Sequence, residues 1–110
     1  METREFKVQG SAPEPYKVTF KKDGSNLNAS CTCKAGENGK YCKHRFNILK
    51  GTSEGIVSPN AADVEIVSSW LAGTDVEAAM KTVKELTKEE ERIKSQLSAA
   101  KETLSRAMLK

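Results

Sequence analysis

Apolar and polar residues alternate through the first third of the chain, in three short runs at residues 6–8, 16–20 and 26–31. Successive side chains of a strand point to opposite faces of a sheet, so this period of two predicts strands with one buried face. Asp23 and Gly24 separate the last two runs, and a glycine lets the chain reverse tightly because it accepts a positive φ angle. We therefore expect a small meander of strands whose outer face is polar and partly basic.

The alternation stops after the third run. Residues 34–41 contain two glycines and are predicted to form a loop. Residues 43–50 are predicted to form a short helix that turns Phe46 and Leu49 inward, and Gly51 marks its end. The first half of the chain thus predicts a β-hairpin or meander followed by a helix.

Helical spacing dominates the second half of the chain. A linker rich in serine, glycine and proline at 53–60 precedes apolar residues that recur at helical intervals over 61–72. No glycine or proline interrupts residues 75–109. Capping sequences begin at Thr74 and at Thr87, so this stretch is either one long helix or two helices with a bend near Thr87.

The last stretch also carries an apolar stripe. Ile93, Leu97, Leu104 and Met108 lie at helical spacing and form a candidate interface for a protein partner or a homodimer. The alternative is an intramolecular helical hairpin, in which the apolar residues of 64–71 cover the stripe. Only about two heptads are regular in this pattern, fewer than the three or four typical of a coiled coil, so both interpretations stay open.

Composition limits the class of protein. Of the 110 residues, 37% are hydrophobic and 30% are charged, which is typical of a soluble protein with a small core. No apolar run approaches the roughly 18–20 residues of a membrane span, and the N-terminal residues lack the apolar stretch of a secretory signal. We therefore expect an intracellular protein, cytoplasmic or nuclear, that has no membrane association.

The net charge of +3 is unevenly distributed, with +5 in residues 1–52 and −2 in residues 53–110. Any attraction to phosphate is therefore expected in the first half of the chain. Tyr16 and Tyr41 are candidate stacking residues for bases, although Tyr16 is in phase with the apolar strand face. The alternative is an ordinary solvated surface. The candidate nucleic-acid contacts are seven basic residues: Lys17, Lys21, Lys22, Lys40, Lys43, Arg45 and Lys50.

The three cysteines and the single histidine of the chain fall within fourteen positions, as Cys31, Cys33, Cys42 and His44. An odd number of cysteines does not fit a closed disulfide framework. Thiolate and imidazole are the ligands that zinc prefers, in a tetrahedral set of four. The pattern therefore predicts one structural Zn²⁺, with no coordination position left for catalysis; the alternative is three buried or redox-active cysteines beside an unrelated histidine.

The spacing C-x-C-x8-C-x-H, after alternating strands and before a short helix, resembles the SWIM-type zinc finger. The residues flanking the ligands fit as well: the strand 16–20, Cys-Thr-Cys-Lys-Ala-Gly at 31–36, and Cys-Lys-His-Arg at 42–45. The resemblance extends over about residues 4–51 and does not include the helical half. It implies a ββα zinc-binding fold in a module that binds DNA or protein, with Cys31, Cys33, Cys42 and His44 as the zinc ligands.

These observations together predict an α+β protein, with a zinc finger at 1–52, a linker at 53–60 and a helical interaction region at 61–110. We expect a binding protein associated with DNA or RNA, or alternatively a protein adaptor or dimeric scaffold that uses the C-terminal helices. Once the cysteines and the histidine hold a metal, no catalytic set remains. We therefore expect neither an enzyme nor a small-molecule substrate.

Overall fold

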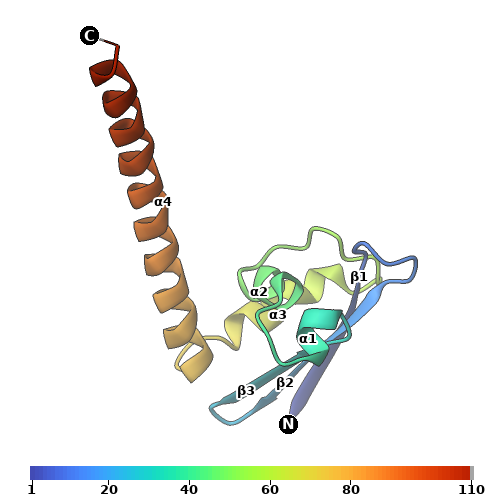
Figure 1. The fold of residues 1–110 in the computed structure, drawn as a ribbon. Coiled ribbons are helices and arrows are strands. Elements are labelled where there is room, and N and C mark those ends of the chain that lie inside the picture. The colour runs from blue at the N-terminus through green and yellow to red at the C-terminus, as the bar shows by residue number, and fades with distance from the viewer. Residues whose placement is uncertain (110) are drawn as a thin grey trace. The chain divides into compact units, whose positions relative to one another are not determined.

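A computed structural model describes residues 1–109 of the chain (Figure 1). Its elements, in chain order, are three strands and then five helices: β1 (Glu2–Val8), β2 (Tyr16–Asp23), β3 (Asn26–Cys31), α1 (Lys34–Glu37), α2 (Lys43–Leu49), the 3₁₀ helix η1 (Ala61–Asp63), α3 (Val64–Ser69) and α4 (Asp75–Ala107). The predicted α+β class is confirmed. Within residues 1–109, no helix combines the length and the apolar character that spanning a bilayer requires.

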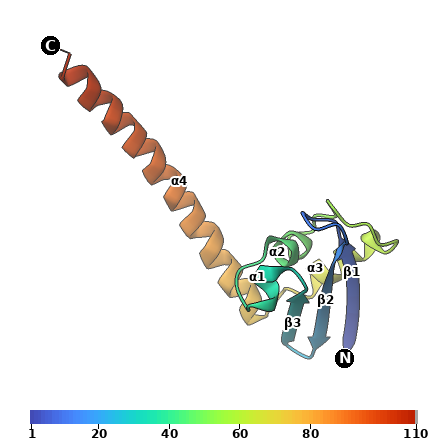
Figure 2. The same cartoon turned by 45° about the vertical axis from the view of Figure 1, so that its right-hand side comes forward.

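The three strands form an antiparallel meander in the order β1-β2-β3 (Figure 2). The register places Phe6 opposite Val18 and Phe20 opposite Ala29. Phe6, Val18 and Phe20 are fully buried, and the two phenyl rings meet edge to face with centroids 6.1 Å apart. The period of two in the sequence is therefore confirmed, because each buried position alternates with an exposed one such as Lys17.

The rest of the core comes from the short helices. Ile48 and Leu49 of α2 are buried, as are Val64 and Val67 of α3. The prediction that Phe46 turns inward is only partly right. Its ring is half-buried and stacks on Tyr41, with centroids 4.3 Å apart, while Ile48 enters the core instead. The expected loop at 34–41 also begins with one helical turn, α1.

Residues 53–60 do not separate two domains, contrary to our expectation. They run along the free edge of β1: Gln9 N donates to Gly55 O and Val57 N donates to Lys7 O, both at 2.8 Å. An exposed strand edge leaves backbone groups without partners, and this segment supplies them. The first compact unit therefore extends from Met1 to Glu77 and includes α3.

Residues 75–107 form one helix, α4, rather than two helices with a bend between them. Thr74 Oγ1 accepts a hydrogen bond from Glu77 N at 3.2 Å and so caps the start of α4. No bend occurs at Thr87, whose hydroxyl donates to Val83 O at 2.7 Å within the helix. The helix has 33 residues, none of them buried. The apolar residues expected to cover it, Val64 and Val67, belong instead to the core of the first unit.

Candidate metal centre

Three elements bring the four candidate ligands together. Cys31 is the last residue of β3, and Cys33 is the N-cap of α1 two residues later. Cys42 is the N-cap of α2, and His44 lies in the first turn of that helix. The three sulfur atoms and one histidine nitrogen all lie within 4.8 Å of one another. The reversal through α1 thus closes the sequence gap between the two ligand pairs.

The distances between the ligand atoms fit a tetrahedral zinc ion. The Nδ1 atom of His44 lies 3.7 Å from Cys31 Sγ and 3.6 Å from Cys42 Sγ. A sulfur and a nitrogen that share a tetrahedral zinc ion, at bond lengths of about 2.3 and 2.0 Å, are about 3.6 Å apart. Cys33 Sγ and Cys42 Sγ are separated by 3.3 Å, too far for a disulfide bond, and all three cysteines are free.

Backbone N–H groups support two of the sulfur atoms. Cys33 N donates to Cys31 Sγ at 3.5 Å, and Gly36 N donates to Cys33 Sγ at 3.3 Å. Such donors stabilise thiolates and orient them toward a bound metal. The burial of the three cysteines and the two N–H contacts thus enclose the sulfur atoms within the protein.

Gly36 and Gly10 permit this packing because they lack side chains. A Cβ atom on Gly36 would lie 2.5 Å from the carbonyl oxygen of Cys31, and one on Gly10 would lie 2.5 Å from the ring of Tyr16. That ring in turn packs against the imidazole of His44, with centroids 5.0 Å apart. The sequence pattern predicted an ordinary turn at Gly36 and no role for Gly10. The only sequence signal was the position of Gly36 three residues after a ligand.

Burial and local hydrogen bonds set the protonation of the metal-free site. Burial raises the pKa of the Cys31 thiol to about 12. Burial disfavours the Cys42 thiolate too, but the backbone N–H groups of Arg45 and His44 and the neighbouring thiols outweigh it and lower the pKa of Cys42 below 9.0. Burial, helped by the charge of Lys43, lowers the pKa of His44 below 6.5. The imidazole is therefore neutral near pH 7 and available as a ligand.

The seven candidate cations do not form one surface. Lys17 and Lys21 lie on the outer face of the sheet, opposite the buried residues, and Lys17 pairs with Glu5 at 3.4 Å. Lys22 Nζ donates to the carbonyl of Gly24. In the part of the chain that the structure describes, three of the candidates outside the sheet have no ion pair and no side-chain hydrogen bond: Lys40, Lys43 and Lys50.

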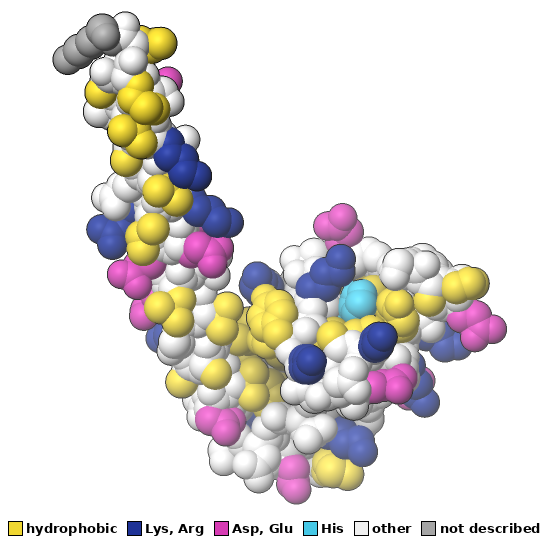
Figure 3. Space-filling model, in the orientation of Figure 1, with side chains coloured by type: hydrophobic (Ala, Val, Ile, Leu, Met, Phe, Trp, Pro, Cys, Tyr) yellow, Lys and Arg dark blue, Asp and Glu magenta, His cyan; other side chains and the backbone are white. Residues whose placement is uncertain are grey.

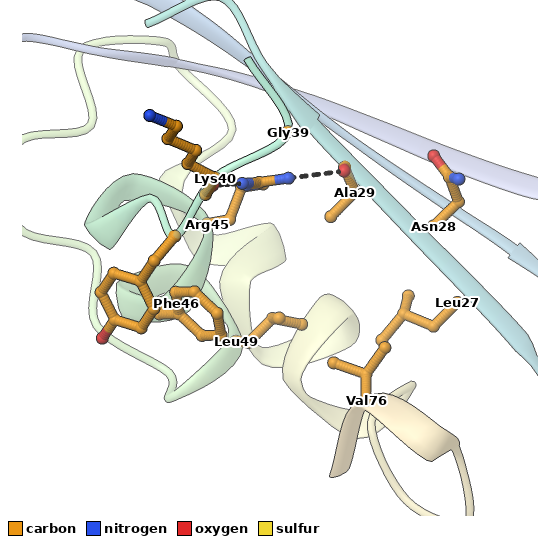
Figure 4. Close-up of a pocket in the computed structure, with 10 residues that line it drawn as sticks. Leu27, Asn28, Ala29, Gly39, Lys40, Arg45, Phe46, Leu49 and Val76 are labelled. Carbon is orange, nitrogen blue, oxygen red and sulfur yellow. Dashed lines mark hydrogen bonds between the residues drawn. The ribbon is translucent and has the colours of Figure 1, made fainter. Parts of the chain in front are cut away.

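Arg45 has a structural role that its sequence position did not reveal. Its guanidinium donates to Ala29 O at 3.2 Å and to Lys40 O at 2.6 Å. It thereby ties the loop before α2 to β3, along a hollow of about 410 Å³ that Leu27, Phe46 and other residues line (Figure 4). The side chain is only partly exposed, and its Nε atom is buried without a partner. The guanidinium is therefore engaged within the protein.

The fold and the site together define a small zinc-binding module. Two pairs of ligands, Cys31 with Cys33 and Cys42 with His44, hold one structural zinc ion. The family model of the SWIM zinc finger matches residues 16–45, from the start of β2 into α2, and this segment contains all four ligands. The resemblance predicted from the ligand spacing is therefore confirmed over this segment, which is shorter than the expected 4–51. Comparisons with curated proteins and with solved structures gave no match.

Proposed function

We propose that the finger binds nucleic acid through the surface beside the metal site, where Lys40, Tyr41 and Lys43 are exposed. The observation that carries the proposal is the surplus of positive charge here: residues 34–50 hold five basic side chains and a single carboxylate, Glu37. Basic side chains, in dark blue, lie above and below the histidine on this face of the molecule (Figure 3). Such clusters supply the sequence-independent part of nucleic-acid affinity.

The metal site itself opposes this attraction. Three thiolates, one neutral imidazole and one Zn²⁺ carry a net charge of −1. Lys43 lies between the ligands Cys42 and His44, and Lys40 lies two positions before Cys42. Within residues 1–109, neither lysine pairs with a carboxylate. The lysines therefore outweigh the charge of the site and leave the surface attractive to phosphate.

Tyr41 adds a second kind of contact to the same surface. Its side chain is 59% exposed, and Phe46 holds one face of its ring in a stack. A fixed aromatic ring with a free face provides a platform for an unpaired base. This arrangement favours single strands over duplexes, because bases in a duplex are already stacked.

Fluorescence anisotropy of labelled oligonucleotides with the zinc-loaded protein tests the proposal. We expect single-stranded DNA or RNA to bind more tightly than a duplex, with an affinity that falls as salt rises. Removing two phosphate contacts in Lys40→Ala/Lys43→Ala should reduce the slope of log K against log salt by about 1.4, since each contact contributes about 0.7 on a single strand.

A matched control removes the same charge elsewhere. Lys84→Ala/Lys88→Ala changes two exposed lysines of α4, and its salt slope should equal that of the parent protein. Tyr41→Ala should weaken binding without changing the slope. Equal slopes for the two lysine pairs, or no binding at low salt, would refute the proposal.

Protein interaction is a second candidate function, and it concerns a different part of the chain. The observation that favours it is the exposure of large apolar side chains on α4, including Leu97 and Leu104. It does not compete with nucleic-acid binding, because the residues involved are separate.

A further inference from the structure

The continuity of α4 places its apolar residues in a single heptad register. Positions spaced alternately by four and three residues run without a break from 79 to 104: Ala79, Val83, Leu86, Glu90, Ile93, Leu97, Ala100 and Leu104. All but Glu90 are apolar. A bend at Thr87 would have divided this register in two. The register is therefore continuous only because α4 is a single helix. Four heptads meet the length that is typical of a coiled coil.

The same positions are exposed in the single chain. Leu86 is 58%, Leu97 53% and Leu104 60% exposed, and hydrophobic side chains follow the helix along its length (Figure 3). A soluble helix normally buries such a stripe against another element. The seam extends for about 40 Å at 1.5 Å per residue, which is long enough for a second helix to lie along it.

We propose that α4 pairs with α4 of a second copy of this chain, in antiparallel orientation; this inference rests on the protein-interaction function and not on nucleic-acid binding. In an antiparallel pair, each first position of the heptad faces a fourth position of the other helix. Centring the pair between 91 and 92 places both alanines of the seam opposite larger residues. Ala79 faces Leu104, Val83 faces Ala100, Leu86 faces Leu97, and Glu90 faces Ile93.

Side-chain volume favours this orientation over the parallel one. Helical interfaces pack best when a large residue faces a small one. Each alanine of the seam, Ala79 and Ala100, meets a larger residue in the antiparallel pair. A parallel pair places each alanine opposite its own copy and leaves two gaps in the interface.

Charge favours the same orientation. A parallel pair places Glu90 opposite its own copy at the seam, whereas the antiparallel pair places it opposite Ile93. In the single helix Glu90 already pairs with Lys94 at 3.4 Å, so its charge is balanced within its own chain. The parallel pair would gain contacts between Glu89 and Lys94 at the margin, but exposed ion pairs of this kind contribute little.

Substitutions of Gln96 distinguish the antiparallel from the parallel dimer, because Gln96 has a different neighbour on the second helix in each. It flanks Glu89 of the second copy in the antiparallel pair and Lys101 in the parallel pair. Sedimentation equilibrium of the zinc-loaded full chain measures the dimer dissociation constant. We expect Gln96→Lys to tighten the dimer about threefold and Gln96→Glu to weaken it about threefold at low salt, with both effects lost at high salt.

Leu97→Asp is expected to make the chain monomeric, and its zinc content should be unchanged because Leu97 lies outside the metal-binding unit. The reverse order for the two Gln96 variants would overturn the antiparallel orientation. A parent protein that remains monomeric up to millimolar concentration, or forms a trimer, would overturn the dimer itself. Oligonucleotide binding by Leu97→Asp is measured in parallel, so loss of the dimer is distinguished from failure of the nucleic-acid proposal.

Discussion

Replacing Gly36 by alanine tests whether the close approach of α1 to β3 controls the metal site. Helix propensity alone predicts a gain in stability, since alanine is better than glycine in a helix by about 1 kcal/mol. The structure predicts the opposite. The added Cβ would lie 2.5 Å from Cys31 O and 2.9 Å from Cys31 Cβ, and the first of these is a rigid backbone atom. The helical turn has to move away from the strand that carries a ligand.

The magnitude follows from the balance of these effects. An ordinary contact between these atoms begins near 3.4 Å, so the turn has to retreat by about 0.9 Å from its 2.5 Å approach. Overpacking of this kind costs about 1–3 kcal/mol, and the N–H of Gly36 also loses its 3.3 Å contact with Cys33 Sγ. The lost N–H contact costs roughly 1 kcal/mol and offsets the propensity gain of about 1 kcal/mol. We therefore expect a net loss of about 1–3 kcal/mol in zinc binding, or roughly 5- to 150-fold in affinity.

Competition with a chelator of known zinc affinity measures this loss. Cobalt substitution provides a second readout, because the absorption bands of a thiolate-bound cobalt ion report the ligand geometry. Gly39→Ala is the control: Gly39 has φ +68° and no atom within 4 Å of an added Cβ, so the change strains the backbone without pushing on a ligand. If Gly36→Ala binds zinc as tightly as the parent, the packing argument is wrong.

Two further predictions concern protonation and the loop before α2. The Cys31 thiol, with a pKa of about 12 in the metal-free protein, must release its proton when zinc binds, whereas burial lowers the pKa of His44, so that its imidazole is mostly neutral from pH 7 upward. Zinc affinity should therefore rise at least about tenfold per pH unit from pH 7 to 8. Equal zinc dissociation constants at pH 7 and pH 8 would contradict this prediction. Arg45→Met removes the donors to Ala29 O and Lys40 O. It should lower the free energy of unfolding of the zinc-loaded protein by about 1–3 kcal/mol in urea denaturation, and an unchanged midpoint would show that these hydrogen bonds contribute nothing.

Local chemistry explains which features could be predicted from the sequence. The ligand set was predictable because Cys31, Cys33, Cys42 and His44 lie close together along the chain, and few metals other than zinc prefer such a set. The buried strand positions were predictable because the two faces of a strand alternate in the sequence itself. Both properties depend on residues that lie within one short segment of the sequence.

The sequence alone left the roles of Arg45, Gly36 and residues 53–60 undetermined. Arg45 and residues 53–60 contact strands that are distant in the sequence, and the role of Gly36 depends on how closely the chain folds back on Cys31. In the sequence Arg45 is a candidate nucleic-acid contact, whereas in the structure its guanidinium donates a hydrogen bond to the carbonyl of Ala29. In the sequence Gly36 looks like an ordinary turn glycine, and only the structure shows that Cys31 of β3 occupies the space that a Cβ atom would need. Residues 53–60 have the composition of a linker, yet their backbone groups form hydrogen bonds with the edge of β1. Because every residue carries backbone groups, composition does not reveal such pairing.

The sequence by itself thus determined the metal chemistry, the strand faces and the helical character of the second half. The tertiary structure decided which cations have no ion pair, which glycines lie against neighbouring atoms, and whether residues 75–107 form one helix. The last point has the largest consequence. Two capping residues allow a bend at Thr87 but do not require one, because a threonine hydroxyl can bond within the helix as well as cap it.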